Sequence, residues 1–391
     1  MNPSLIPGAN EESHFKQLDT LVLGVTSGCN LRCEYCHNAI YYDAYDQHVS
    51  MPIDLALKAI RDYVDYVILS GSERAVVCLT GGEPLLRGND YLSTLFRGID
   101  QIQADSHVPV HRDLVTNATL LTPDYCKMFK EYGVNVSVSV DGPAYLTDSH
   151  RIPRVAGQSS ADLIRESMRL LHHYEIPFGV LATITSTAVG HEREMVSYFQ
   201  SAEPTVISFN PCVDKGPRLS VSDYSRFLSR LFDEWVMSGK YFPAIRTFRY
   251  FFHQMTGHVG MDIPCEWNND CPNTVSISAD GKVWVCEMYM GCSEGCLGDI
   301  RNDSITEISQ SDKFRAFVRD VKKLSDHCLS CEAFECCKGG CVHRRVNGRD
   351  YLCEATLTLY RRMHRFLDKV VSGPLSSTAE TESTSAIGEP T

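Results

Sequence analysis

The sequence predicts an α/β fold in which a partial (β/α)6 barrel precedes a cysteine-rich C-terminal domain. Apolar strand-like runs alternate with helical patterns over the first ~210 residues, which is the signature of a parallel sheet. A full TIM barrel has eight strands, and the six predicted here indicate an incomplete barrel. A chain of 391 residues can bury a large core and still hold a second, smaller domain.

The six predicted strands and the helices between them follow from short apolar runs and from periodic apolar positions. The strands are expected at 18–26, 75–80, 112–116, 134–140, 178–184 and 205–209. The intervening helices are expected at 53–69, 91–103, 123–132, 161–174 and 192–200. Helices at 221–237 and 245–255 lead into a cysteine-dense region, and a last helix at 355–371 has apolar residues at Leu359, Met363, Phe366, Leu367 and Val370.

We expect five segments. They are an N-terminal extension at 1–17, the barrel at 18–220, a helical bridge at 221–262, the cysteine-rich domain at 263–371 and a tail at 372–391. The tail is rich in Ser, Thr, Glu and Pro and poor in large apolar residues, so it is predicted to be disordered.

Composition excludes several classes of protein. The net charge of −12 argues against a nucleic-acid-binding surface, and no apolar run of about 18 residues suggests a membrane span. The first residues have neither the basic region nor the apolar stretch of an export signal. Seventeen cysteines without an export signal therefore indicate metal clusters in a reducing cytoplasm.

A C-x3-C-x2-C triplet, Cys29, Cys33 and Cys36, lies just past the end of the first strand. The chemistry of parallel barrels sits at this end of the strands. Three thiolates can hold three corners of a 4Fe-4S cluster and leave the fourth iron open to a small molecule. A structural zinc site needs four ligands, commonly as C-x2-C pairs, and disulfides need an oxidising compartment, so both alternatives fit less well.

This spacing, with Tyr35 before the last cysteine, resembles the radical S-adenosylmethionine (SAM) superfamily. The resemblance implies that the open iron chelates SAM and that one electron cleaves SAM to a 5′-deoxyadenosyl radical. The segment after the second strand matches the family motif for the amino group of SAM, since glycines allow close approach and the glutamate offers an acceptor. Its residues are Gly81, Gly82, Glu83 and Pro84.

Further candidates for SAM binding end the third and fourth strands. In related enzymes the segment holding Ser139 and Asp141 touches the ribose, and Asn117 is a similar candidate. Arg151 is expected to pair with the SAM carboxylate, since a guanidinium fork suits that geometry. The alternatives are a helix cap for Asp141 and a surface ion pair for Arg151.

The later cysteines resemble the SPASM extension of radical SAM enzymes, which holds two auxiliary 4Fe-4S clusters. The segment between Cys271 and Cys286 reads as a hairpin with Asp280 and Gly281 at its turn. The resemblance assigns one auxiliary cluster to Cys265, Cys271, Cys286 and Cys341. It assigns the other to Cys328, Cys331, Cys337 and Cys353.

Three cysteines of this region have no assigned role. Cys336 competes with Cys337 as a ligand, although the C-x5-C spacing favours Cys337. Cys292 and Cys296 lie in a loop, and unmodified thiols are the expected reading. The predicted cofactors are therefore three 4Fe-4S clusters, one binding SAM and two auxiliary, together with SAM.

The resemblance implies an oxidoreductase that modifies peptides or proteins. Our preferred reading is a maturase of ribosomally made precursor peptides that installs an oxidative crosslink, cyclophane-like or thioether. The alternative is an anaerobic sulfatase-maturating enzyme that oxidises Ser or Cys to formylglycine. Such enzymes carry an Asp base after the cysteine matching Cys286, where this chain has Glu287, a hypothetical base. A non-catalytic, zinc-rich scaffold is the more distant rival.

The expected partners follow from the same resemblance. They are a precursor peptide or protein substrate and an electron donor such as flavodoxin or ferredoxin, with no nucleic acid and no membrane. About 28 residues precede the triplet, which is too few for a fused leader-binding domain. A separate leader-binding protein is therefore an additional candidate partner.

Overall fold

The computed structural model describes residues 17–42, 48–213, 218–239, 243–258 and 264–372. The predicted extension at 1–17 and the predicted tail at 372–391 lie outside these ranges, except for their residues nearest the fold. Six parallel strands form the barrel sheet, which confirms the predicted fold class. They are β1 (Thr20–Thr26), β3 (Ala75–Gly81), β4 (Val110–Thr116), β5 (Val134–Ser139), β7 (Phe178–Ile184) and β8 (Val206–Pro211).

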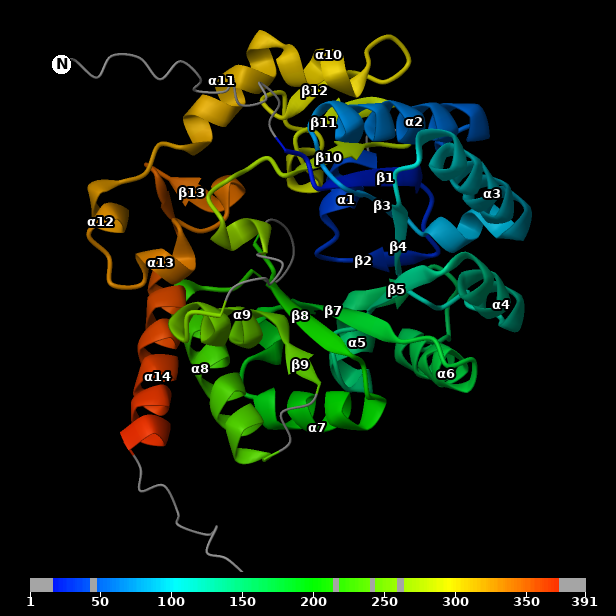
Figure 1. Ribbon diagram of the computed structural model, residues 1–391. Helices are drawn as coiled ribbons and strands as arrows, with labels where there is room; N and C mark the ends of the chain where they lie inside the picture. Colours follow the sequence, from blue (N-terminus) through cyan, green and yellow to red (C-terminus); the bar gives the residue numbers. More distant parts are fainter. Residues whose placement is uncertain (1–16, 43–47, 214–217, 240–242, 259–263, 373–391) are drawn as a thin grey trace, which may run out of the picture.

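Helices follow these strands and cover the outer face of the sheet (Figure 1). Strand β3 illustrates the alternation that directs one face toward the helices: Ala75, Val77 and Leu79 are fully buried, whereas Val76 and Cys78 between them are only partly buried. The outer face thus supplies an apolar layer for the helices. They are α2 (Ile53–Leu69), α3 (Gly88–Ser106), α4 (Pro123–Tyr132), α6 (Ser160–His173) and α7 (Glu192–Ala202).

The sheet continues into the cysteine-rich region. Strand β10 (Thr274–Ile277) pairs in parallel with β1, and β11 (Lys282–Trp284) and β12 (Cys296–Asp299) follow in antiparallel order. At the other edge β9 (Ala244–Ile245) pairs with β8. The order is β12-β11-β10-β1-β3-β4-β5-β7-β8-β9, so one ten-stranded sheet spans the predicted domain boundary. The predicted Asp280–Gly281 hairpin is confirmed, with Gly281 at φ +85°.

Three helices close the side of the molecule beside β8 (Figure 1). They are α8 (Val221–Met237), α9 (Arg246–Met255) and α14 (Cys353–Ser372). Phe366 of α14 packs on Phe232 of α8 and Phe252 of α9, with ring centroids 5.6 and 6.1 Å apart. The predicted packing face of the last helix is thus confirmed for Leu359, Met363 and Phe366, whereas Val370, near the end of the helix, is exposed.

Several short elements lack a counterpart among the predictions. Near the triplet these are β2 (Leu31–Cys33), α1 (His37–Tyr42), α5 (Ala144–His150) and β6 (Arg151–Pro153). In the cysteine-rich region they are α10 (Ile305–Gln310), α11 (Asp312–Val321), α12 (Asp326–Leu329), α13 (Phe334–Cys337), β13 (Arg345–Val346) and β14 (Arg349–Asp350). Among the residues that the structure describes, every helix is too short or too polar to span a bilayer.

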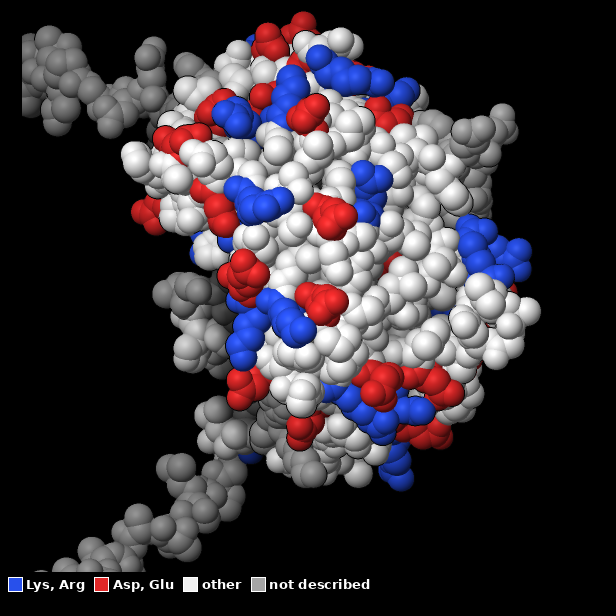
Figure 2. Space-filling view, turned by 90° about the vertical axis from the view of Figure 1, so that its right-hand side faces the viewer, with Lys and Arg blue, Asp and Glu red and all other residues white. Residues whose placement is uncertain are grey.

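Charges of opposite sign lie next to each other on the face that carries α3, α4 and α6. Figure 2 shows Lys and Arg beside Asp and Glu over this face. Neighbouring turns of α4 and α6 account for part of the pattern, through pairs such as Lys127–Asp124 and Arg165–Asp162.

Candidate functional site

The cysteine triplet lies at the carboxyl ends of the barrel strands. Cys29 follows β1, Cys33 ends β2, and Cys36 precedes α1. Strand β2 pairs with β6 in antiparallel register, which fixes Cys33 opposite Arg151. Burial, together with the charge of neighbouring Cys36, raises the pKa of Cys29 to about 11 and that of Cys33 to about 12. Thiolates this close need compensating positive charge, so the donor set fits three iron sites of a cluster.

The Gly81–Pro84 turn packs directly on the loop that carries the triplet. The Gly82 amide donates to the Thr26 carbonyl at 2.7 Å, and the Glu83 amide donates to the Gly28 carbonyl at 2.8 Å. A Cβ atom on Gly82 would lie 2.0 Å from the Gly28 carbonyl oxygen. Only glycine therefore allows this turn to approach the cluster loop.

The Glu83 carboxylate is fully buried and holds together three backbone and side-chain groups around the site. It accepts hydrogen bonds from the Leu85 amide at 3.0 Å, the Thr116 hydroxyl at 2.7 Å and the Asn117 amide at 2.7 Å. Burial raises its pKa to about 7, although these bonds oppose the shift. A carboxylate has about four acceptor positions, so one remains for the predicted ammonium contact. Pro84 is also buried, at the start of a single helical turn.

The other predicted SAM contacts lie around the same strand ends. The Asn117 side-chain amide donates to Asn30 Oδ1 at 3.0 Å and reaches Cys29 Sγ at 3.7 Å. It therefore lies against the cluster loop. Ser139 is half-buried at the end of β5, beside Leu181 in register. Contacts of Asn117 and Ser139 with the ribose stay predictions.

Arg151 has a buried partner in this structure. Its Nε and Nη2 atoms donate to the two Asp141 oxygens at 3.1 and 2.9 Å, and Tyr35 donates to the same carboxylate. The Arg151 guanidinium also lies 5.5 Å from the Tyr35 ring. The pair is no surface ion pair, since both side chains are buried, and Asp141 is no helix cap, since Pro143 occupies the N-cap of α5. The predicted pairing with the SAM carboxylate remains a prediction.

One residue at this site was absent from the sequence-based candidates. Asn38 is 7% exposed and donates from Nδ2 to the Gly81 carbonyl at 3.1 Å. Its Oδ1 atom finds no hydrogen-bond partner among the described residues. A buried acceptor without a partner suits a ligand donor beside the glycine turn. Its place two residues after Cys36 was the available signal.

The four thiols predicted for one auxiliary cluster lie near enough to act on one another electrostatically. Cys265, Cys271, Cys286 and Cys341 derive from four separate turns and strand ends. Burial raises the pKa of Cys286, and the charges of Cys271 and Cys341 raise it further. Burial likewise raises the pKa of Cys265, and Cys341 and Cys286 contribute to the shift. These mutual effects support the assignment of the four thiols to one cluster.

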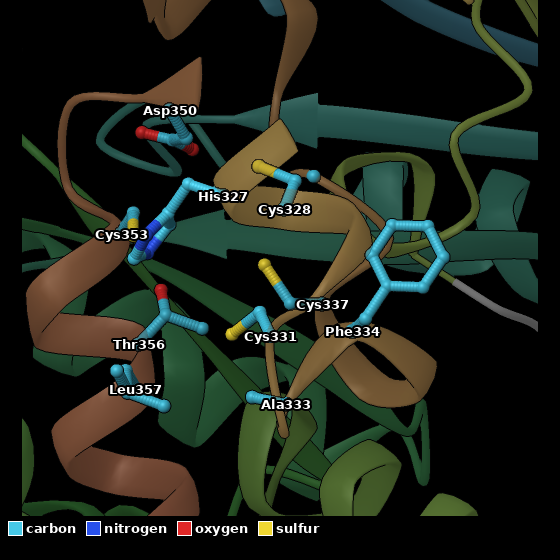
Figure 3. Close-up of a pocket in the computed structure, with 11 residues that line it drawn as sticks. His327, Cys328, Cys331, Ala333, Phe334, Cys337, Asp350, Cys353, Thr356 and Leu357 are labelled. Carbon is cyan, nitrogen blue, oxygen red and sulfur yellow. The ribbon is translucent and has the colours of Figure 1, made fainter. Parts of the chain in front are cut away.

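The four thiols predicted for the other cluster line a single pocket. Figure 3 shows Cys328, Cys331, Cys337 and Cys353 around it, with His327 and Asp350 at its edge. Cys336 lies instead in the apolar core, 4% exposed. The helical turn of α13 thus points the two adjacent cysteines in different directions, as the spacing argument expected. Cys296 begins β12 beside Trp284, and Cys292 lies in the preceding turn.

Glu287 links the segment of the first auxiliary thiol set to the segment of the Gly81–Pro84 turn. The Thr80 hydroxyl donates to Glu287 Oε1 at 2.9 Å, and Thr80 immediately precedes the Gly81–Pro84 turn. Cys286, the preceding residue, belongs to the first auxiliary set. A carboxylate therefore stands between the two predicted cofactor sites.

Comparison with known families fits this geometry. The profile of the Radical SAM superfamily matches residues 23–200, and that of the SPASM iron-sulfur cluster-binding domain matches residues 265–332. The chain carries a radical SAM domain and a SPASM domain. The SPASM match ends before Cys337, Cys341 and Cys353, which the structure nevertheless brings to the two thiol sets.

Relatives by sequence include sulfatase-maturating enzymes. The cysteine-type anaerobic sulfatase-maturating enzyme of Clostridium perfringens is 26% identical over 361 residues, which cover 86% of this chain and 94% of the relative. The serine-type enzyme of Klebsiella aerogenes is 24% identical, with 89% and 85% covered.

Solved structures share the radical SAM–SPASM fold. Native anSMEcpe with bound AdoMet and Cp18Cys peptide has a TM-score of 0.80 at 24% identity, covering 90% of this chain and 98% of that one. Streptococcus suis SuiB bound to precursor peptide SuiA has a TM-score of 0.63 at 15% identity, with 87% and 76% covered. These likenesses concern the fold.

The domain matches confirm the predicted cofactor classes. A radical SAM domain with a SPASM domain holds SAM, its 4Fe-4S cluster and auxiliary 4Fe-4S clusters. The chain is thus a radical SAM enzyme. The assignment of individual cysteines to the clusters stays a prediction that the gathered thiols support.

Proposed function

We propose that this radical SAM enzyme oxidises a cysteine or serine side chain of a polypeptide to formylglycine. Its relatives of both the cysteine type and the serine type match nearly the whole chain. The likeness to the peptide-binding maturase SuiB is weaker. The comparisons therefore favour the second of the two readings of the sequence over the preferred crosslinking reading.

The position of Glu287 is the observation that carries this proposal. Formylglycine formation needs a base near the reacting carbon, and the substitution of Glu for the family's Asp put that base in doubt. The 2.9 Å hydrogen bond from Thr80 holds the longer side chain beside the glycine turn. A carboxylate at this place is within reach of a substrate that lies between the SAM site and Cys286.

SAM and Glu287 have separate roles in the proposed oxidation. Bound SAM supplies a 5′-deoxyadenosyl radical that removes one hydrogen atom from the substrate Cβ. Glu287 accepts the proton of the substrate thiol or hydroxyl, and one electron leaves toward the Cys286 side. A serine thereby becomes an aldehyde, whereas a cysteine becomes a thioaldehyde that water converts to the aldehyde and hydrogen sulfide.

A cavity lies at the amino-terminal ends of β1, β3 and β10, on the opposite side of the sheet's strand ends from the cysteine triplet. Val76, Asp113, Arg246 and Cys265 are among its lining residues. Asp113 pairs in register with Cys78, two residues before Thr80 on the same face of β3. The electron donor, flavodoxin or ferredoxin, and a leader-binding protein remain candidate partners.

The test is anaerobic turnover with two matched peptides. The reconstituted enzyme, SAM and dithionite are incubated with peptides that differ only in a central Cys or Ser. We expect an aldehyde that reacts with a hydroxylamine reagent, with loss of sulfur from the cysteine peptide. A product that loses only hydrogen and resists the reagent would instead support crosslinking. Glu287→Gln should still cleave SAM but yield at least tenfold less aldehyde.

A further inference from the structure

The Arg345 guanidinium is half-buried and bonded only to neutral acceptors. No carboxylate within the described residues forms an ion pair with it. Its Nε and Nη1 donate to the carbonyls of Gly339 and Val321 at 3.0 and 2.7 Å. Its Nη2 donates to Asn269 Oδ1, the Gly340 carbonyl and the Lys338 carbonyl at 2.8, 3.0 and 3.4 Å.

The nearest acid, Asp350, is already neutralised. Its Oδ2 atom accepts from Nε and Nη2 of Arg344 at 2.9 and 2.8 Å and from the Cys341 amide at 3.1 Å. Its other oxygen accepts from the Leu352 amide at 2.9 Å. Arg345 therefore keeps a positive charge without a counter-ion of its own. A half-buried charge of this kind is costly unless a negative group lies nearby.

The acceptors of Arg345 lie next to members of both auxiliary thiol sets. Gly340 precedes Cys341, and Asn269 lies two residues before Cys271, both in the first set. Lys338 follows Cys337 of the second set. Burial lowers the pKa of Arg345, and negative charge on Cys271, Cys328 and Cys341 opposes that shift. Arg345 thus stands between the two auxiliary sites.

We infer that Arg345 is a positioning residue that serves as the shared counter-charge of both auxiliary clusters and raises the reduction potential of each. A 4Fe-4S cluster held by four thiolates is negative in both oxidation states and more so when reduced. A fixed positive charge nearby therefore favours the reduced form. Arg345 then makes both sites better acceptors for the electron left by substrate oxidation. This inference rests on the ligand sets of the proposed function.

Arg349 provides a matched control for this inference. Its Nε donates to Cys353 Sγ at 3.0 Å, in the second set alone. Its Nη2 atom pairs with Glu354, so its charge is balanced locally. The structure places no contact of Arg349 on the first set among its hydrogen bonds to described residues. Replacing it should affect one cluster only.

The experiment is a redox titration followed by electron paramagnetic resonance. The full chain carries Cys29→Ala, Cys33→Ala and Cys36→Ala, so that the auxiliary clusters alone give the signals. In this background, Arg345→Gln should shift both potentials downward. At a fixed potential the ratio of reduced to oxidised cluster should fall about tenfold, which is about 59 mV for one electron. Arg345→Lys should retain most of both potentials, and Arg349→Gln should shift only one.

Several outcomes would overturn the inference. Unchanged potentials in Arg345→Gln with full iron content would do so, and so would a shift of one cluster only. Loss of iron in both Arg345→Gln and Arg345→Lys would show that the five hydrogen bonds matter and the charge does not. Failure of the ligand sets is a separate result: Cys271→Ala and Cys328→Ala would then keep all their iron.

Discussion

At the scale of single residues, a hydrogen bond from Thr80 holds the side chain of Glu287, the base of the proposed function. Glu287 has one methylene more than the aspartate of sulfatase-maturating enzymes, and a shift of ~1 Å at a base can cost much of its activity. The Thr80 hydroxyl fixes Oε1 at 2.9 Å and removes the freedom that the added methylene gives. Replacing Thr80 alone therefore tests whether Glu287 needs this hydrogen bond.

This pair leads to a first prediction. Thr80→Val removes a hydrogen bond to a charged group, worth about 1.5–3 kcal/mol, and should lower aldehyde formation about tenfold while SAM cleavage continues. The measurement is the ratio of 5′-deoxyadenosine to aldehyde. Thr80→Ser should restore coupling, and the exposed Thr122→Val should leave it unchanged. Equal coupling in Thr80→Val and the parent enzyme would show that Glu287 needs no tether.

Glu83 gives a second prediction, on pH and stability. Its pKa is raised from 4.5 to about 7 by burial, so the folded apoprotein binds more protons than the unfolded chain between these values. The free energy of unfolding should therefore decrease as the pH rises from about 4.5 to about 7, by up to about 3 kcal/mol. Denaturant unfolding across this range checks it. Glu83→Gln should flatten the decrease, whereas the exposed Glu131→Gln should leave its slope intact.

The hydrogen-bond partners of Glu83 and Arg151 could not be predicted from the sequence. The motif identified Glu83 and Arg151 as candidates, and both lie at the site. Their protein partners are Thr116, at the end of β4, and Asp141, two residues past the end of β5, and a single sequence gives no sign of such pairings. The sequence therefore marks both groups as candidates for SAM, whereas in the fold hydrogen bonds within the protein take up much of their bonding capacity.

At the scale of elements, regular strands and long helices were predictable and short ones were not. The period of apolar residues located β7 and α2 to the residue, since each buries a complete face. Elements such as β2 and β6 have only three residues each and present no period. They exist because the barrel places their chain segments side by side. The Gly81–Pro84 turn, by contrast, could be predicted, because paired glycines indicate a place where the backbone must pass close to another group.

That steric need supports a third prediction. Gly82→Ala would place Cβ 2.0 Å from the Gly28 carbonyl, so the turn must move away from the cluster loop. SAM affinity should fall at least tenfold, and stability should fall by about 2 kcal/mol. Equilibrium binding of SAM to the reconstituted protein checks it. Gly157→Ala, at φ +82° with open space around it, should cost about 1 kcal/mol without loss of SAM affinity. Similar SAM affinities for the two variants would contradict the steric argument.

At the scale of the whole molecule, the two matched domains share one continuous β-sheet. Strand β10 of the SPASM region pairs with β1 of the barrel, next to the strand that leads to the triplet. The thiol sets also interleave, since Cys341 lies between members of one set in sequence and joins the other in space. Glu287 depends on this union, because its backbone belongs to one domain and its partner Thr80 to the other.

Interleaving supports a last prediction, on iron content. Cys341→Ala should remove the first auxiliary cluster alone, so that iron falls from ~12 to ~8 atoms per chain. Cys336→Ala should keep all the iron, because that thiol is buried in the apolar core, and it should cost about 1 kcal/mol for the lost packing. Iron and sulfide analysis of anaerobically reconstituted protein checks both. Loss of iron in Cys336→Ala would contradict the choice of Cys337 over Cys336 as a ligand. Full iron in Cys341→Ala would contradict the assignment of Cys341 to the first auxiliary cluster. Loss of two clusters in Cys341→Ala would mean that the auxiliary sites fold only together, since Cys341 lies between the segments that build each of them.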